Sequence, residues 1–308
     1  MNPLNSILVA TDTQLEDQSI VSAAAAVAKH HGASLMIVDV IQDLGWAARL
    51  SIQNLEHVRN SLHQVAGEKL NALAEIVREQ GVKVETKLLE GKTSVSIVRE
   101  VVSGQHDLLV AVGKGDKSRR HGVFGQTARQ LLRYCPRALW LMPSGVPPTF
   151  KHVLACVDTS SEDPVDAELN DKIYTLAAAI SEQQGSQLSV LHAWNMVDEA
   201  VLSARLNNET VDKHLADEAD YRKRLFDKFL KQLRASVRPQ DVHMIKESPP
   251  KAVSDFVAKE NVDLVVMGSV GRSGLSGLLI GNTAEKILDG IECAVLAVKP
   301  YGFKCPIT

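Results

Sequence analysis

The sequence predicts an α/β protein made of two similar halves, each with an open, mostly parallel sheet covered by helices on both faces. Three observations support this fold class. Apolar strands alternate with helical patterns, the second half repeats motifs of the first in the same order, and each half places a glycine-containing loop between a strand and a helix. Parallel strands need crossover connections, and the intervening helical segments supply them.

The first half begins with an apolar strand at residues 6–12, which ends in Asp12. Further strands are predicted at residues 31–38, 82–88, 107–110 and 138–142. A long helix before the strand at residues 82–88 is indicated by an apolar stripe of helical period: Leu55, Val58, Leu62, Val65, Leu73, Ile76 and Val77.

The second half repeats this order. Residues 152–158 match 6–12, 184–191 match 31–38, 263–266 match 107–110, and 281–288 match 125–132. A second helical stripe occupies the corresponding place: Leu215, Tyr221, Phe226, Phe229, Leu233 and Val237.

Such ordered repeats indicate a tandem duplication. A segment rich in proline and glycine, residues 143–148, interrupts both helix and strand patterns. The first domain is therefore predicted at residues 1–146 and the second at residues 150–308.

The amino-acid composition limits the classes of function that this chain can have. A net charge of −3 argues against a general nucleic-acid or membrane-surface binder, because such proteins usually carry a basic excess. Without a leader or an apolar run long enough to cross a bilayer, the chain is expected to be cytoplasmic. The four cysteines form no C-x-x-C pair, so reduced thiols are expected rather than a disulfide framework or a cysteine-zinc site.

The strongest functional signal is the glycine-rich loop between the apolar strand at residues 263–267 and the helical run that resumes at Ala284. Glycines allow positive φ and close approach, and a following helix N-terminus attracts anions, so this order predicts a phosphate-binding loop. Neither the dinucleotide fingerprint G-x-G-x-x-G nor a Walker loop is present.

The spacing Gly268-x-x-Gly271, nine residues, then Gly281-Asn282 resembles the ATP-binding signature of the universal stress protein family, G-2x-G-9x-G-[S/T]. The one departure is Asn282, although Thr283 follows and could supply a hydroxyl. The resemblance covers nearly the whole chain and is to tandem-domain members. It implies the adenine nucleotide alpha hydrolase-like (HUP) fold with strand order 3-2-1-4-5, and two halves docked as an intramolecular pseudo-dimer.

In this fold, ligands bind where the strand order reverses, between the first and fourth strands. The resemblance then implies a role for each matching position. Asp158 and Thr159 lie near the adenine and ribose, Ala193 flanks the base, Met267 ends the fourth strand, Gly268, Gly271 and Arg272 border ribose and phosphates, and Gly281, Asn282 and Thr283 hold the phosphates.

Several of these residues also have purely structural interpretations. Asp158 could cap the following helix, and Asn282 with Glu285 resembles a capping box. Arg272 could be a solvated loop charge, and His192 is expected to be a hydrogen-bonded structural residue rather than a ligand or base.

The corresponding loop of the first half departs from the signature. Asp116 stands at roughly the place of Gly271 in the second half, the spacing to Gly125 is one residue shorter, and Gln126 replaces the small polar residue after Gly125. A carboxylate there would repel phosphate. ATP binding by the first half is therefore expected to be weaker or absent, and the lysines and arginines of this loop are expected to be solvated.

The leading hypothesis is a non-catalytic regulator of the stress response that binds ATP in its second half, with protein partners and homo-oligomerisation left open. Asp158 could hold Mg²⁺ together with phosphate oxygens. No catalytic residue and no metal site built by the protein itself is predicted. The alternatives are an ATP-dependent enzyme, including a slow ATPase, and a scaffold or carrier of another small molecule.

Overall fold

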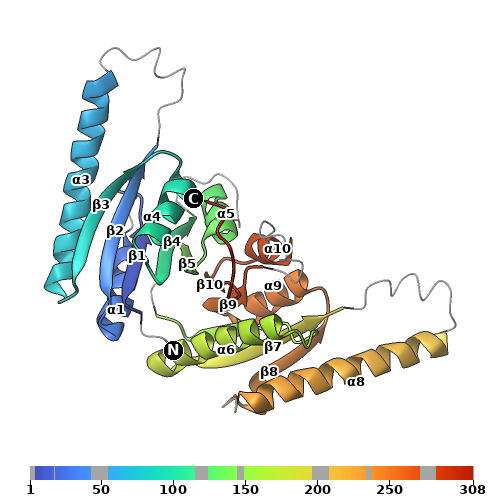
Figure 1. The fold of residues 1–308 in the computed structure, drawn as a ribbon. Coiled ribbons are helices and arrows are strands. Elements are labelled where there is room, and N and C mark those ends of the chain that lie inside the picture. Colours follow the sequence, from blue (N-terminus) through green and yellow to red (C-terminus); the bar gives the residue numbers. More distant parts are fainter. Residues whose placement is uncertain are drawn as a thin grey trace.

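A computed structural model describes residues 4–16, 18–42, 55–114, 124–143, 149–195, 208–233, 237–270 and 282–307. These residues form one ten-stranded sheet in the order β3-β2-β1-β4-β5-β10-β9-β6-β7-β8 (Figure 1). The strands are β1 (Ser6–Ala10), β2 (Ser34–Ile41), β3 (Val84–Glu90), β4 (Leu108–Lys114), β5 (Ala138–Pro143), β6 (His152–Cys156), β7 (Gln187–Trp194), β8 (Val242–Lys246), β9 (Leu264–Gly268) and β10 (Ala294–Val298).

Each half has the strand order 3-2-1-4-5, and its own strands pair in parallel. The halves meet through their fifth strands, because β5 and β10 pair antiparallel with Leu296 opposite Trp140. The predicted fold class, two tandem open-sheet α/β units, is confirmed, and their two sheets are continuous across the chain.

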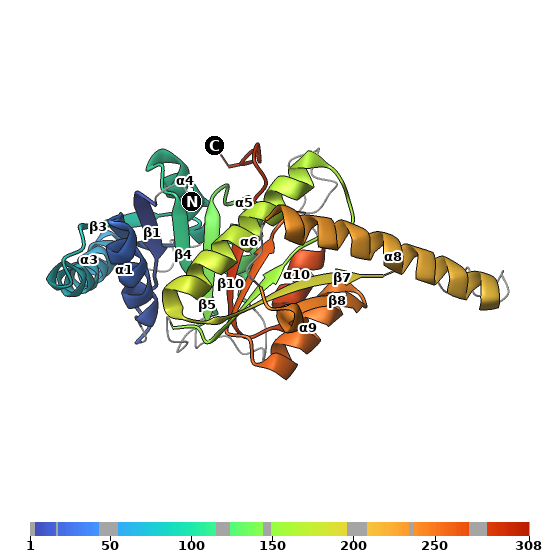
Figure 2. The same cartoon turned by 90° about the horizontal axis from the view of Figure 1, so that it is seen from below.

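Helices cover both faces of the sheet (Figure 2). One face is covered by α1 (Ser19–His31), α3 (Leu55–Glu79), α6 (Pro164–Gln184) and α8 (Asn208–Gln232). The other is covered by α4 (Thr93–Ser103), α5 (Gln126–Tyr134), α9 (Pro249–Glu260) and α10 (Asn282–Gly290), and a short 3-10 turn, η1 (Pro239–Asp241), precedes β8. The hydrophobic core therefore forms two layers, each of which runs through both halves.

The repeat is visible in how the helices end. Helices α1 and α6 both end at a glycine in the left-handed conformation, Gly32 with φ 65° and Gly185 with φ 66°. Side chains with a Cβ rarely adopt this conformation, whereas glycine does so without strain and lets the chain turn directly into the next strand. The two glycines therefore start β2 and β7 in the same way.

Helix α3 forms as predicted, but its apolar stripe does not coincide with its buried face. Leu62, Val65 and Ile76 are exposed, whereas Val77 is buried. The rest of the buried face is supplied by residues outside the predicted stripe: Ala66, Leu70 and Ala74. In α8, Phe226 and Phe229 are buried as expected, while Tyr221 is 44% exposed.

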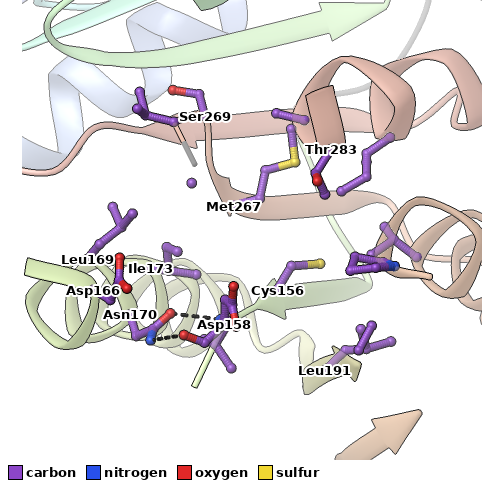
Figure 3. Close-up of a pocket in the computed structure, with 18 residues that line it drawn as sticks. Cys156, Asp158, Asp166, Leu169, Asn170, Ile173, Leu191, Met267, Ser269 and Thr283 are labelled. Atoms are coloured by element: carbon purple, nitrogen blue, oxygen red, sulfur yellow. Dashed lines mark hydrogen bonds between the residues drawn. The ribbon is translucent and has the colours of Figure 1, made fainter. Parts of the chain in front are cut away.

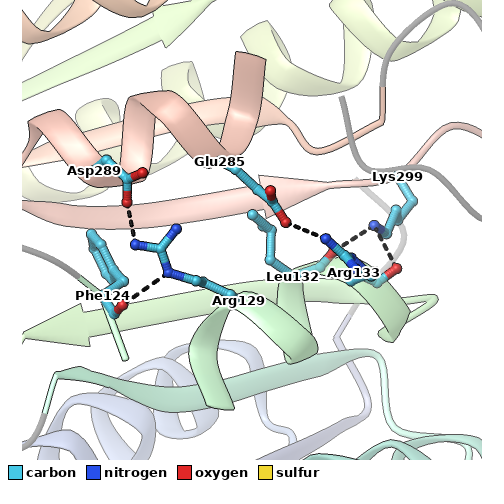
Figure 4. A network of polar contacts seen from close by, with 7 residues as sticks. All are labelled: Phe124, Arg129, Leu132, Arg133, Glu285, Asp289 and Lys299. Carbon is cyan, nitrogen blue, oxygen red and sulfur yellow. Dashed lines mark hydrogen bonds and ion pairs between the residues drawn. The ribbon is translucent and has the colours of Figure 1, made fainter. Parts of the chain in front are cut away.

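Two ion pairs join α5 of the first half to α10 of the second (Figure 4). Arg129 pairs with Asp289, and Nη2 of Arg133 lies 2.6 Å from Oε1 of Glu285. Arg129 and Glu285 occupy equivalent positions in the two repeats, as do Arg133 and Asp289. The two pairs are thus the two pseudo-symmetric copies of one contact.

A buried lysine completes this interface. Nζ of Lys299, which follows β10, donates to the carbonyl of Leu132 at 2.6 Å in the last turn of α5. Beyond it, Sγ of Cys305 lies 3.3 Å from the carbonyl oxygen of Tyr134. The C-terminal segment of the second half therefore packs on the end of a first-half helix.

Candidate functional site

A cavity of about 180 Å³ lies in the second half at the carboxyl ends of β6 and β9, where the strand order reverses (Figure 3). It is smaller than the 300–1,000 Å³ typical of ligand pockets, so the described walls have room for only part of a drug-sized ligand. Its lining residues come from β6, β7, β9, α6, α9 and α10: Cys156, Val157, Asp158, Asp166, Leu169, Asn170, Ile173, Leu191, Ala193, Pro249, Val253, Met267, Gly268, Ser269, Val270, Thr283, Ala284 and Ile287.

The backbone of Asp158 is fixed by a buried asparagine on α6. Oδ1 of Asn170 accepts from the Asp158 amide at 2.9 Å, and Nδ2 of Asn170 donates to the Asp158 carbonyl at 2.8 Å. Both bonds are visible in Figure 3. Because both backbone polar groups of Asp158 are held by Asn170, the position of Asp158 in the cavity wall is well defined.

The carboxylate of Asp158 does not cap the following helix. It accepts from the amide of Ser160 at 3.1 Å and from the hydroxyl of the same residue. The N-cap of α6 is Asp163, whose Oδ1 accepts from the Val165 amide at 2.8 Å. The capping interpretation of Asp158 is therefore wrong.

Two kinds of surface line the cavity. Asp158 and Asp166 bring carboxylates to one side, from the loop after β6 and from the first turn of α6. The remaining walls are mainly apolar, and Leu169, Ile173 and Leu191 are drawn among them in Figure 3. A flat apolar group with polar substituents on one edge suits such a lining.

The end of β9 packs tightly against α6. A Cβ built on Gly268 would lie 3.0 Å from Cδ2 of Leu169, so this glycine makes room for a side chain of the protein itself. The hydroxyl of Ser269 donates to the carbonyl of Val298 at 3.3 Å, and the residue is almost fully buried. Both residues thus have structural contacts besides their place in the cavity wall.

Five of the predicted site residues line this cavity together: Asp158, Ala193, Met267, Gly268 and Thr283. Thr159 is buried next to Asp158 and Asn282 is exposed at the start of α10, but neither is among the lining residues. The predictions for Gly271, Arg272 and Gly281 fall outside the described residues.

Two further expectations concern His192 and Glu285. His192 is fully buried, its Nδ1 lies 3.3 Å from the Val157 carbonyl, and its ring packs on Phe226, which confirms a structural role. Oε1 of Glu285 accepts from Arg133. Glu285 is thus engaged across the interface between the halves, which the capping-box interpretation did not anticipate.

The first half has a different cavity, of about 360 Å³, at the carboxyl ends of its own strands. Polar side chains from the ends of β2, β3 and the starts of α4 and α5 line it: Gln42, Lys92, Thr93, Ser94, Gln126, Thr127 and Gln130, with Gly91. Asp12 is not among them, and its Oδ1 accepts from the Gln14 amide at 2.8 Å.

The end of β4 in the first half is covered by an aromatic ring. A Cβ built on Gly113, which the strand register aligns with Ser269 of the second half, would lie 2.5 Å from Cε1 of Phe124. Phe124 is 4% exposed, so its ring is packed there in the folded protein. The strand end that borders the cavity in the second half is therefore occupied by a side chain in the first.

Sequence reasoning missed Asn170 and Asp166. Both lie on α6, where a polar residue normally indicates the solvent-facing side of a helix. One available signal was the position of Asn170, three residues before the buried Ile173 and therefore on the same helix face.

The described residues contain no group of three or more His, Cys, Asp or Glu side chains that could hold a metal ion. Among the helices of the described ranges, none is long and apolar enough to span a membrane. All four cysteines are free, as expected, and burial raises the pKa of Cys135 to about 11. The Cys156 thiol in the cavity wall also has its pKa raised by burial.

Fold and site together define a class: a tandem α/β protein with one partly apolar cleft at the point of strand-order reversal in its second half. Comparison with known families agrees with this class, since the universal stress protein family matches residues 3–143 and again residues 149–299. The chain belongs to the universal stress protein family and contains two of its domains in tandem.

Similar proteins share this arrangement over nearly their whole length. Universal stress protein E of Photorhabdus laumondii is 25% identical over 98% of this chain and 97% of its own. Universal stress protein E of Escherichia coli strain K12 is 23% identical over 98% and 96%. The resemblance to tandem members is thereby confirmed.

Solved structures agree on the fold. The crystal structure of a protein of unknown function from Pseudomonas aeruginosa PAO1 superposes with a TM-score of 0.76 at 23% identity, over 96% of this chain and 93% of that one. A universal stress protein from Archaeoglobus fulgidus DSM 4304 gives a TM-score of 0.63 at 16% identity, over 97% and 99%.

Proposed function

We propose that the second half of this protein binds an adenine nucleotide, ATP, and that the chain acts as a non-catalytic regulator in a stress response. The observation that carries this proposal is the cavity at the carboxyl ends of β6 and β9, which is bordered by the start of α10. Sequence adds the glycine spacing between Gly268 and Gly281 that precedes this helix.

The lining residues fit the parts of a nucleotide in one orientation. The apolar walls suit the base, and the carboxylates of Asp158 and Asp166 suit the hydroxyl groups of ribose as hydrogen-bond acceptors. The same carboxylates would repel phosphates, which are favoured instead at the N-terminus of α10 near Thr283. When bound, a Mg²⁺ ion would supply charge neutralisation at the phosphates, and Asp158 is the carboxylate proposed to hold it together with phosphate oxygens.

Side chains of the described cavity favour binding over chemistry. The Cys156 thiol has a raised pKa, and the Ser269 hydroxyl is directed to a backbone carbonyl. A nucleophile needs an adjacent base, and His192 does not line the cavity. These observations support regulation through nucleotide occupancy, while slow hydrolysis of ATP is the alternative to be measured.

We further propose that binding is confined to the second half. In the first half, Phe124 covers the end of β4, and the sequence places Asp116 where Gly271 stands in the second half. A ring at the strand end and a carboxylate in the loop both oppose a bound phosphate. The polar cavity beside α4 lacks the apolar walls that suit a base.

Titration calorimetry with ATP tests the proposal, with matched substitutions at the two strand-end aspartates. The expected stoichiometry is about one per chain, Asp158→Ala weakens binding, and Asp12→Ala leaves it unchanged. Two equal sites, or loss of binding with Asp12→Ala alone, would show that the wrong half was chosen.

Two measurements decide among the alternatives. Phosphate release during prolonged incubation with ATP would favour a slow ATPase, provided that Asp158→Ala abolishes it. Mass spectrometry of ligand released from purified protein would favour a carrier of another small molecule if it detects a stoichiometric compound that is not an adenine nucleotide.

A further inference from the structure

The first turn of α10 carries an acidic residue directed at the other half of the chain. Thr283 and Ala284 line the cavity, and Glu285 follows them in the same turn. Its Oε1 lies 2.6 Å from Nη2 of Arg133 on α5, which belongs to the first half. Figure 4 shows the two side chains reaching toward each other between the helices.

This carboxylate is close to the end of the helix where a phosphate would bind. A negative charge in the first turn is favourable for the helix itself, because it complements the helix dipole. For a bound triphosphate it is unfavourable, since like charges repel, most strongly at low salt. The phosphate affinity of α10 therefore depends on how far Glu285 is neutralised.

We propose that Arg133 of the first half is an electrostatic positioning residue for the nucleotide site of the second half. Its guanidinium holds the Glu285 carboxylate on the α5 side of α10 and cancels its charge, so that phosphates meet a helix terminus of positive potential. The inference rests on the proposed binding of ATP in the second half. It gives the first half, whose own loop departs from the signature, a direct part in ligand binding by the second.

The interface supplies a matched control. Arg129 forms the pseudo-equivalent ion pair with Asp289, which lies in the last turn of α10, four residues beyond Glu285. Four residues correspond to about 6 Å along a helix. Loss of this pair therefore perturbs the docking of the same two helices, but at the end of α10 opposite to the N-terminus where the phosphates are proposed to bind.

The experiment compares Arg133→Met with Arg129→Met by titration with ATP and with adenosine, at low and at high salt. Arg133→Met is expected to weaken ATP binding about tenfold at low salt and less at high salt, because the repulsion is screened. Adenosine, which has no phosphates, is expected to bind unchanged, and Arg129→Met is expected to alter ATP affinity by less than about twofold.

A second variant keeps the test decisive if an arginine variant folds poorly. Glu285→Gln removes the repelling charge, so it is expected to tighten ATP binding and to cancel the effect of Arg133→Met in the double variant. An increase in affinity cannot result from unfolding. Circular dichroism melts without ligand identify any variant whose fold has changed.

Several results would overturn the inference. If Arg133→Met weakens the binding of ATP and of adenosine equally, Arg133 is only a general structural contact. If Arg129→Met weakens ATP binding as much as Arg133→Met does, the loss is due to altered docking of the halves. Weaker ATP binding by Glu285→Gln would contradict the electrostatic argument. If the unchanged protein binds no ATP, the proposed function fails as well; if it binds ATP and Arg133→Met does not matter, only this inference fails.

Discussion

Substitution of the buried Lys299 by methionine should change how the stability of the protein depends on pH. Lys299 is 3% exposed, and its Nζ donates to the Leu132 carbonyl at 2.6 Å and lies 4.5 Å from the ring centre of Phe303. Burial lowers the pKa of Lys299 to about 8, because the ammonium loses its hydration. The folded state therefore holds the charge at an energetic cost.

The size and sign of this cost follow from the two protonation states. Below pH 8 both folded and unfolded chains carry the proton, and the full cost is present. Between about pH 8 and the ordinary lysine pKa of about 10.4, the unfolded chain binds more protons than the folded one, so the free energy of unfolding rises with pH. Over this pH range the contribution of Lys299 to the free energy of unfolding becomes more favourable by about 3 kcal/mol.

Urea denaturation of both proteins between about pH 7.5 and 10.5 measures this contribution, as the free energy of unfolding of the native chain minus that of Lys299→Met. The difference should increase with pH in favour of the native chain. Burial raises the pKa of the Cys135 thiol to about 11, although the nearby Lys299 ammonium lowers it, so this thiol stays largely protonated in both folded proteins over this pH range and adds little to the difference. A difference that is flat or falls with pH would refute the assignment of a depressed lysine pKa.

Two further predictions concern the site. Asn170→Leu removes both hydrogen bonds to the backbone of Asp158, so thermal or urea melts should show a loss of about 1–3 kcal/mol, and calorimetry should show weaker ATP binding; unchanged melts would mean that the loop is held otherwise. Gly113→Ala should be more destabilising than Gly268→Ala, by about 1–3 kcal/mol, because its Cβ would meet the ring of Phe124 at 2.5 Å whereas the other meets a flexible leucine at 3.0 Å. Equal melting temperatures for the two alanine variants would show that the ring moves freely.

The fold could be predicted from the sequence because its strands are short, apolar and repeated in order. Which face of a helix is buried could not be predicted as well. In α3, Leu62 and Val65 are apolar but exposed, whereas the small Ala66 and Ala74 are buried. Apolar periodicity alone does not distinguish two adjacent flanks of a helix, and the choice between them depends on which flank the sheet contacts.

The candidate site was predictable where it depends on chain order and unpredictable where it depends on contacts between elements. Asp158 follows strand one and Met267 lies at the end of strand four, so topology brings them together. The hydrogen bonds of Asn170 to the Asp158 backbone and the ion pair of Glu285 with Arg133 join residues that only tertiary packing brings together. Their sequence pattern, polar residues within helices, is shared by ordinary solvent-exposed positions.

The ion pairs between α5 and α10 show how duplicated halves came to differ. Arg129 and Arg133 in the first half are equivalent to Glu285 and Asp289 in the second, and they pair crosswise: Arg129 faces Asp289, and Arg133 faces Glu285. Two first halves docked in this way would oppose arginines to arginines, and two second halves would oppose acids to acids. The divergence therefore favours pairing of unlike halves, through repulsion in the wrong pairs as much as attraction in the right one.

Each pair is partly exposed, so it contributes at most about 1 kcal/mol to stability, and discrimination between partners is its larger effect. This choice of charges has a consequence at the cavity. It gives the first turn of α10 a carboxylate, next to the residues that line the pocket. A helix that is to receive phosphates then needs a cation against that carboxylate, and in this chain the cation belongs to the other half. If the second half binds ATP as proposed, partner selection and ligand affinity are linked through one residue, Glu285.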